Sequence, residues 1–395
     1  MPFESSLFAF RKHSFTMKHL IIDSLLFLMI CSCGQTGDNA LNIIILDHFA
    51  SSPQKINIDE IAAHIDYIQL ETTPSSLIAR IEKIQTKEDK IYILDAMTRS
   101  ILVFDISGKF IRRIATKGRG PGEYISITDF ALCDSVILVR DGGQAKVILY
   151  DSLGRLIAET YTISNYIDRV AFYKGMAVGS ANYPRFAYNN GFRISLFDRN
   201  LNPVSVMLKS EIDLDEASAN QYGMGHSRSF FANVNDTLTF WECRDDVVYK
   251  IVDENEIIKK YIFKYKNPAK FEDGMDKRNS GCNEITSMKE GRNHIFMVGG
   301  YDNEYRRLIY FKKTNKGVCV DGMIQNSNGP DFFPAGIDGG LADDGKAYRL
   351  FSVYDYKTAF ENSKTSLENL DPKLQSLLET CQVDDNPCIM LVTLK

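Results

Sequence analysis

Residues 91–111 read IYILDAMTRSILVFDISGKFI, and residues 137–157 read ILVRDGGQAKVILYDSLGRLI. The two stretches align without a gap when residue n is matched with residue n + 46, so that Asp95 falls on Asp141 and Asp105 on Asp151. A repeat of this length, built from short strand-like runs, is typical of the blades of a β-propeller. The repeat therefore indicates the fold before any single residue is interpreted.

Each copy contains two apolar runs of strand length, which in the first copy are 91–94 and 101–104. Val, Ile, Leu, Phe and Tyr in such runs suit a buried pleated sheet. A turn of the form Asp-x-x-Gly-Lys/Arg follows, in which the aspartate accepts backbone N–H bonds and the glycine tolerates a positive φ. Strand, turn and strand in this order predict most of a four-stranded antiparallel blade, whose apolar faces must be buried against neighbouring blades.

Weaker copies of the pattern continue to the C-terminus and predict an all-β, six-bladed propeller, with five or seven blades as alternatives. The N-terminal runs 41–46 and 65–70 are expected to close the ring against the last blade. A short helical insertion is expected within 366–381, because Pro372 begins a run with leucines at helical spacing. The later strand runs lie in 194–202, 237–256, 294–317, 348–353 and 388–394.

The composition is that of a globular protein with a large core. The chain has 395 residues, of which 44% are hydrophobic and 25% are charged, and its formal net charge is −5. A general nucleic-acid-binding protein usually presents a basic face, so no nucleic-acid partner is expected. The histidines form no HxH, HExxH or HxxxH pair, so neither a metal nor another cofactor is predicted.

The N-terminus resembles the signal peptide of a bacterial lipoprotein. A basic start at Met17-Lys18-His19 precedes the apolar stretch 20–30, and Cys33 follows at the place of the lipidated cysteine. Cys33 has a small residue before it, whereas the alternative, Cys31, is preceded by a bulky isoleucine. The apolar stretch is shorter than the ~20 residues that a membrane-spanning helix needs.

These features predict a leader over 1–33 with its true start at Met17, a tether over 34–40 and a propeller domain over 41–395. Acyl chains on Cys33 would hold the protein on a membrane, because each buried methylene contributes about 0.8 kcal/mol. By resemblance to bacterial lipoproteins, glycine rather than aspartate after Cys33 implies the outer membrane. A tether without an acidic run implies the periplasmic side of that membrane.

The segment 104–124, FDISGKFIRRIATKGRGPGEY, resembles the NHL-like six-bladed β-propellers found among bacterial lipoproteins. In that family, a strand and an aspartate turn lead into a Gly-x-Gly-Pro-Gly-Glu-Phe/Tyr linker, which here is 118–124. The resemblance is strong over 80–160, and the ending 386–391, NPCIML, resembles the family's last strand. It implies a fold and an envelope location but no reaction, because the family's activities are mostly unassigned.

Three loop segments are predicted to carry ligand-binding groups, because rigid scaffolds present recognition residues on their loops. The glycines of 118–122 match no phosphate-binding motif and suit a tight connection between blades. The long segments 217–232 and 267–283 combine arginine or lysine with aromatic residues, which suits a polar ligand, although a solvated loop without a ligand is the simpler interpretation. The candidate ligand-binding residues are Arg119, Glu123, Tyr124, Tyr222, His226, Arg228, Lys270 and Arg278.

No catalytic residue is predicted. Asp95 and Asp141 occupy equivalent positions in two copies, which favours turn capping over catalysis. We therefore expect a lipid-anchored scaffold that binds an envelope protein, a peptide or a carbohydrate. The alternative hypothesis is a lyase, a lactonase or a glycan-acting hydrolase with its site at the central pore, where His, Asp and Glu side chains would have to converge. A third hypothesis is a structural lipoprotein that docks a protein partner.

Overall fold

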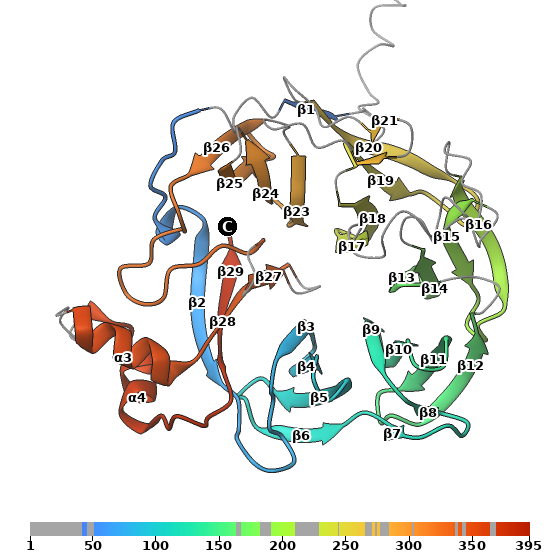
Figure 1. The fold of residues 1–395 in the computed structure, drawn as a ribbon, viewed down its shortest axis with the longest axis horizontal. Helices are drawn as coiled ribbons and strands as arrows, with labels where there is room; N and C mark the ends of the chain where they lie inside the picture. Colours follow the sequence, from blue (N-terminus) through green and yellow to red (C-terminus); the bar gives the residue numbers. More distant parts are fainter. Residues whose placement is uncertain are drawn as a thin grey trace, which may run out of the picture. The chain divides into compact units, whose positions relative to one another are not determined.

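The repeated strand runs form six antiparallel sheets that follow one another around a central axis (Figure 1). The structure is a computed structural model. It describes residues 42–45, 51–162, 167–181, 191–209, 229–243, 245–264, 271–272, 275–276, 284–301, 304–335, 339–341, 345–363 and 369–395. Residues 42–395 form one unit, and the six-bladed propeller predicted from the repeat is confirmed within it.

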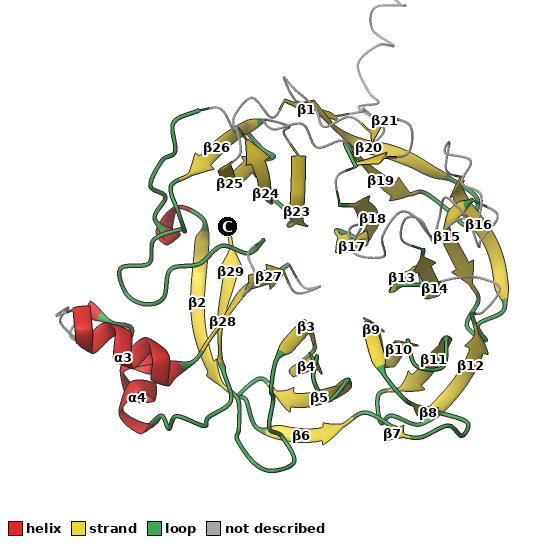
Figure 2. Cartoon of the chain, in the orientation of Figure 1, coloured by secondary structure: helices red, strands yellow, loops and turns green. Residues whose placement is uncertain are grey.

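Blades 1 to 3 each consist of four consecutive strands, with the first strand nearest the axis and the fourth at the rim (Figure 2). Blade 1 contains β3 (Ile81–Lys87), β4 (Lys90–Asp95), β5 (Ser100–Asp105) and β6 (Phe110–Arg113). Blade 2 contains β9 (Ile127–Cys133), β10 (Val136–Asp141), β11 (Lys146–Asp151) and β12 (Leu156–Tyr161). Blade 3 contains β13 (Arg169–Tyr173), β14 (Met176–Ser180), β15 (Phe192–Phe197) and β16 (Pro203–Lys209).

Blades 4 and 5 repeat this order, and blade 6 takes its outer strand from the N-terminal part of the chain. Blade 4 contains β17 (Ser229–Val234), β18 (Thr237–Glu242), β19 (Val247–Ile251) and β20 (Ile257–Lys264). Blade 5 contains β23 (Glu284–Glu290), β24 (His294–Tyr301), β25 (Glu304–Phe311) and β26 (Lys316–Val320). Blade 6 contains β27 (Gly339–Leu341), β28 (Ala347–Phe351), β29 (Cys388–Leu394) and β2 (Ala62–Gln69), and a 3₁₀ turn, η2 (Ile58–Glu60), precedes β2.

The repeat reproduces the strand register as well as the strands. Ile91 pairs with Phe104 in blade 1, and Ile137 pairs with Tyr150 in blade 2, so the partners differ by the same 46 positions. The two middle strands of each of these blades are buried along almost their whole length, because both of their faces pack on other blades. The continuous apolar runs of the sequence are the result of this packing.

The ring is closed by β2, which pairs antiparallel with β29, and the expectation for run 65–70 is thereby confirmed. The expectation for run 41–46 is wrong. The strand β1 (Asn42–Ile45) pairs in parallel with β20 and becomes a fifth strand of blade 4. An outer strand offers unpaired N–H and C=O groups, and β1 satisfies those of β20, while Ile44 is buried in the core cluster shared by blades 4 and 5.

The insertion in blade 6 contains two helices, of which only the second was expected. Helix α4 (Pro372–Thr380) begins after Asp371, whose side chain accepts the N–H groups of Lys373 and Leu374. Helix α3 (Val353–Ser363) begins at Val353, the last residue of the strand that the sequence pattern predicts over 348–353. It packs Tyr356 and Phe360 against the core of blade 6 at helical spacing, a signal that the preceding strand obscured.

The Asp-x-x-Gly turn is formed as the sequence predicts. In blade 1, Asp105 accepts the N–H groups of Ser107 and Lys109, and Gly108 has φ +91°. In blade 3, the equivalent position is occupied by Leu201 at φ +62°. Leu201 is buried, so its packing offsets the backbone strain that glycine avoids in the other copies.

The two turn glycines provide a matched test of this packing. A Cβ on Gly108 would lie 2.0 Å from the carbonyl oxygen of Gln69 in β2, whereas a Cβ on Gly154, at φ +83°, would meet nothing closer than 3.3 Å. Gly154→Ala should lower the free energy of unfolding by about 1 kcal/mol, and Gly108→Ala by about 3 kcal/mol, because only the latter must displace a neighbouring strand. Urea denaturation measures both, and equal losses would show that φ alone sets the cost.

A buried carboxylate joins blades 4 and 5. One oxygen of Glu290 lies 2.8 Å from the Lys260 ammonium, 2.6 Å from the Lys312 ammonium and 3.0 Å from the Tyr261 hydroxyl. The other accepts a hydrogen bond from Thr239. Burial raises the pKa of Glu290, but the two lysines outweigh burial and hold that pKa below its ordinary value. The charged carboxylate is therefore a structural element of this blade interface.

Glu290→Gln should lower the free energy of unfolding by about 3 kcal/mol at pH 7, because it leaves two partly buried lysines without their counter-charge. Since the pKa of Glu290 is depressed in the folded state, its contribution is present above the unfolded value of about 4.3 and is lost as the pH falls through the folded value. The difference between variant and parent should therefore shrink below pH ~4 in denaturation experiments. Glu304→Gln, at an exposed carboxylate of the same blade, should change stability by less than about 0.5 kcal/mol. A Glu290→Gln loss as small as the control's, or one independent of pH, would contradict this role.

Candidate functional site

The glycine-rich connection between blades 1 and 2 lies on the outer rim of the ring (Figure 1). It contains the short parallel strands β7 (Thr116–Lys117) and β8 (Glu123–Tyr124). The Gly122 N–H donates to Glu159 of β12 at 3.0 Å, and the Gly122 carbonyl accepts from the Tyr150 hydroxyl at 2.9 Å. These contacts hold the connection against the two outer strands of blade 2, β11 and β12.

The three candidate residues of this connection do not form one site. Tyr124 is fully buried in the core between blades 1 and 2, where burial raises the pKa of its hydroxyl, so its ring cannot serve an external ligand. Glu123 accepts the Gly120 N–H at 2.8 Å and stabilises the turn. Arg119 is exposed at the rim. The remaining candidates, Tyr222, His226, Arg228, Lys270 and Arg278, lie outside the described residues, as does Cys33.

The repeated aspartates cap turns, as predicted. Asp95 accepts the N–H groups of Arg80 and Thr98, and Asp141 accepts those of Ile125 and Ser126. Burial raises the pKa of Asp95, but these hydrogen bonds and that of the Thr98 hydroxyl outweigh burial and lower the pKa. Each aspartate thereby joins the turn between the second and third strands of its blade to the segment that enters the blade.

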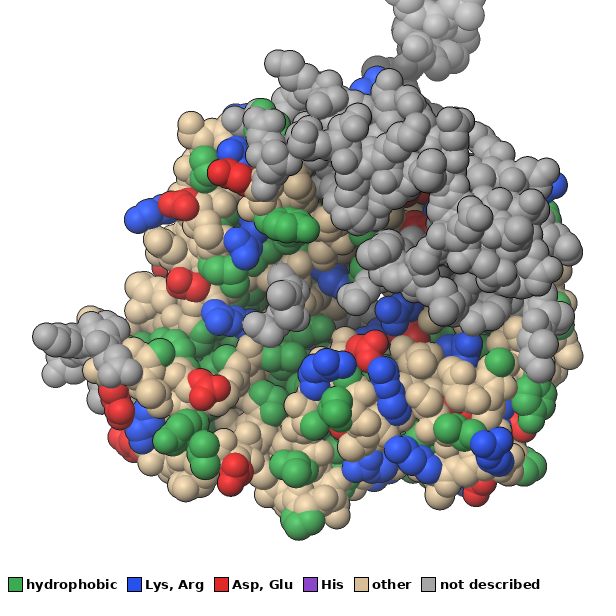
Figure 3. Space-filling view, in the orientation of Figure 1, with side chains coloured by type: hydrophobic (Ala, Val, Ile, Leu, Met, Phe, Trp, Pro, Cys, Tyr) green, Lys and Arg blue, Asp and Glu red, His purple; other side chains and the backbone are tan. Residues whose placement is uncertain are grey.

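Lysine and arginine side chains surround the middle of the ring on the face shown in Figure 3. Among the described residues of the inner strands, Lys83 pairs with Asp129 at 2.8 Å, and Asp129 also accepts the Val170 N–H at 2.8 Å. In the same region, Arg99 pairs with Glu82 at 2.7 Å. Both carboxylates are bound by other groups of the protein, and Asp129 thereby joins blades 1, 2 and 3.

No three His, Cys, Asp or Glu side chains within the described ranges are arranged to hold a metal ion. His294 lies in the core instead, with its ring 5.1 Å from that of Phe311 and 5.9 Å from that of Phe296. Burial and then the nearby Lys312 and Lys313 lower the pKa of His294, so it stays neutral.

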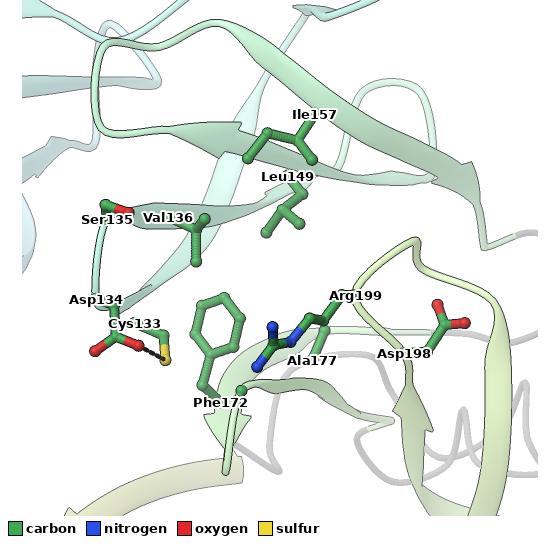
Figure 4. Close-up of a pocket in the computed structure, with 11 residues that line it drawn as sticks. Cys133, Asp134, Ser135, Val136, Leu149, Ile157, Phe172, Ala177, Asp198 and Arg199 are labelled. Carbon is green, nitrogen blue, oxygen red and sulfur yellow. Dashed lines mark hydrogen bonds between the residues drawn. The ribbon is translucent and has the colours of Figure 1, made fainter.

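A cavity of about 290 Å³ opens between blades 2 and 3, among residues that the sequence analysis did not select (Figure 4). Its edge is formed by the β9–β10, β13–β14 and β15–β16 turns. These turns lie at the end of the blades opposite to the Asp95 and Asp141 turns, because successive strands are antiparallel. The lining residues are Cys133, Asp134, Ser135, Val136, Leu149, Ile157, Phe172, Gly175, Ala177, Asp198 and Arg199.

The inner wall of this cavity is apolar, and polar side chains line its opening. Leu149, Phe172 and Ala177 belong to the core cluster shared by blades 2 and 3, and Val136 packs against that cluster. Ile157 extends the apolar wall outward along β12, where 47% of its surface is exposed. The cavity is thus a part of the inter-blade core that no side chain of the described residues fills.

The polar groups at the edge differ in whether they already have partners. Asp198 accepts the N–H groups of Asn200 and Asn202, and hydrogen bonds from Asn202 lower its pKa. Asp134 lies 3.9 Å from the Lys87 ammonium and accepts a hydrogen bond from the Cys133 thiol. Burial, and then Asp134, raise the pKa of that thiol, so it is neither a thiolate nor a nucleophile at neutral pH.

Arg199 is the cationic group of the cavity. Its guanidinium extends toward Phe172, whereas the Asp198 carboxylate points away from the cavity (Figure 4). The turn 198–202 belongs to one of the repeated runs of the sequence, but the cavity beneath it depends on the neighbouring blade. An apolar wall with one cation at its edge is suited to binding a ligand.

The geometry defines a six-bladed β-propeller with an open cavity between two blades. The sequence profile of a domain of unknown function, DUF4934, matches residues 41–393, so the chain belongs to that family. A comparison with curated proteins found no match. In the described part of the chain, no helix has the length and apolar character needed to cross a membrane.

Solved structures share this fold at low sequence identity. A Bacteroides fragilis NCTC 9343 protein, described as a candidate exported protein, aligns with a TM-score of 0.69 and 18% identity over 90% of this chain and 100% of that one. A member of the DUF4221 family from Bacteroides vulgatus ATCC 8482 aligns with a TM-score of 0.50 and 11% identity over 85% and 97%. A virginiamycin B lyase from Staphylococcus aureus has a TM-score of only 0.42, with 12% identity over 72% and 82%. The first two similarities show the fold alone.

Proposed function

We propose that this protein is a lipid-anchored β-propeller of the bacterial cell envelope that acts as a scaffold for binding a ligand or a partner protein. The proposal retains the NHL-like lipoprotein resemblance carried by residues 104–124. The observation that carries the binding role is the cavity between blades 2 and 3, a space of about 290 Å³ with an apolar inner wall and an arginine at its edge. Pockets of this kind, with a few polar groups at their edge, typically bind small ligands.

The envelope location rests on the signal-like sequence before residue 34. Cys33 is the proposed lipid attachment site, and the residues that follow it support the periplasmic side of the outer membrane. The Bacteroides fragilis structure, described as a candidate exported protein, is consistent with export. Envelope proteins, peptides and carbohydrates remain the proposed classes of partner. No observation in the described ranges favours the alternative, an enzyme site at the pore.

Replacing the proposed lipid attachment site should release the protein from membranes. A Cys33→Ala variant should move from the membrane fraction to the soluble fraction when cells are lysed without detergent, because it lacks the acyl chains that hold it. Immunoblotting of the two fractions measures the change, and a Cys31→Ala variant is the matched control. A Cys33→Ala protein that stays with the membranes would contradict lipidation at this residue.

Blocking the cavity should reduce ligand retention. Ser135 is exposed at the edge of the cavity, so the indole of Ser135→Trp would cover the opening at little cost in stability. Compounds retained from an envelope extract, measured by mass spectrometry, should fall at least about tenfold relative to the parent, the loss expected when an apolar site becomes inaccessible.

The control for this experiment is Asn255→Trp, at an exposed turn position of blade 4. It adds the same apolar ring to the surface without approaching the cavity, and it should retain the same compounds as the parent. Equal retention by the parent and both variants would show that the ligand site of the propeller lies elsewhere.

A further inference from the structure

We propose that the cavity between blades 2 and 3 binds a small amphiphile with an apolar body and a single anionic group of the carboxylate class. This inference rests on the binding function proposed above and adds the chemistry of the ligand. It follows from three features of the cavity: the charge at its edge, the space left for that charge, and the lining of its wall.

The charge at the edge favours an anion. Of the two carboxylates that line the cavity, Asp198 is bonded within its own turn, and Asp134 is 91% exposed to solvent and lies 3.9 Å from the Lys87 ammonium. Arg199, in contrast, forms no ion pair with any residue that the structure describes. Its guanidinium extends over an apolar wall, where a ligand carboxylate would accept charge-assisted hydrogen bonds. A cationic ligand would be repelled by the same group.

The backbone beside Arg199 leaves space for the guanidinium. Gly175, in the β13–β14 turn, has φ +79°, and a Cβ built on it would lie 3.4 Å from a terminal nitrogen of Arg199. This distance is an ordinary van der Waals contact, so the guanidinium lies directly against the backbone of this turn. The β13–β14 turn therefore lies in contact with the guanidinium of Arg199, which belongs to the β15–β16 turn.

The wall selects the body of the ligand. Val136, Leu149, Ile157, Phe172 and Ala177 offer no side-chain hydrogen-bonding group, so the part of a ligand that lies against them should be apolar. A volume of about 290 Å³ corresponds to about ten groups of ~30 Å³, the share of one water molecule in the liquid. A linear carboxylate of about ten carbons is the simplest molecule with this size and polarity.

The test compares three ten-carbon probes, decanoate, 1-decanol and decylamine, on the full chain carrying Cys33→Ala, which needs no competing detergent. Calorimetry gives the affinities, and the methyl NMR signals of Leu149 and Ile157 report whether a probe enters the cavity. Decanoate should shift both signals and bind about tenfold more tightly than decanol, as one charge-assisted hydrogen bond predicts. Decylamine should bind more weakly than decanol. Each methylene removed from the carboxylate should weaken binding about fourfold.

The variant Arg199→Gln should weaken decanoate binding about tenfold and leave decanol binding unchanged, and Arg199→Lys should recover part of the loss. Arg155→Gln is the matched control, because Arg155 follows the equivalent turn of blade 2 and pairs with Asp151 outside the cavity lining. It should bind decanoate like the parent.

Two outcomes would overturn the inference in distinguishable ways. If decanol shifts the Leu149 and Ile157 signals as strongly as decanoate does, or if Arg199→Gln binds both equally well, the cavity binds apolar ligands without selecting an anion. The proposed binding function then stands without this ligand class. If no probe shifts either signal, the cavity is not the binding site, and the proposed function loses the observation that carries it as well.

Discussion

The structure depends on one constraint: a four-stranded blade with two apolar faces cannot leave either face in water. Leu102 and Phe104 of β5 are fully buried on the face toward blade 6, while Ile101 and Val103 are fully buried on the face toward blade 2. Burial on both faces requires a neighbour on each side, and a ring provides one without free ends. The pairing of β2 with β29 completes this ring from opposite ends of the propeller domain.

Polar contacts between blades then fix how neighbouring blades meet. Asn386, almost fully buried at the closure, donates to the carbonyls of Glu71 and Ser76 and accepts the Ile78 N–H. Glu290 joins blades 4 and 5 through its ion pairs with Lys260 and Lys312. Such groups are costly to bury unless every bond is made, so they favour one arrangement of adjacent blades over slightly shifted ones.

The sequence predicted the features that repeat and missed several of those that occur once. The 46-residue offset gave the blades, their register and the capping role of Asp95 and Asp141, because these features recur in a fixed local context. The pairing of β1 with β20 and the start of α3 had no second copy to reveal them. Tyr124 was misjudged for a related reason: its motif identifies a connection between blades, but only the fold shows that the ring is buried.

The cavity is one of the features that occur once, and it results from how blades 2 and 3 pack. Blades diverge from the axis toward the rim, so the space between them widens and must be filled by larger side chains. Between blades 2 and 3, the residues facing this space include Ala177 and Gly175, which cannot fill it, while Phe172 and Leu149 form its walls. Small residues at these positions are compatible with either blade alone, and only their juxtaposition leaves an open apolar space. Arg199 at the edge of that space then favours an anionic ligand, a preference that arises only where the two blades meet.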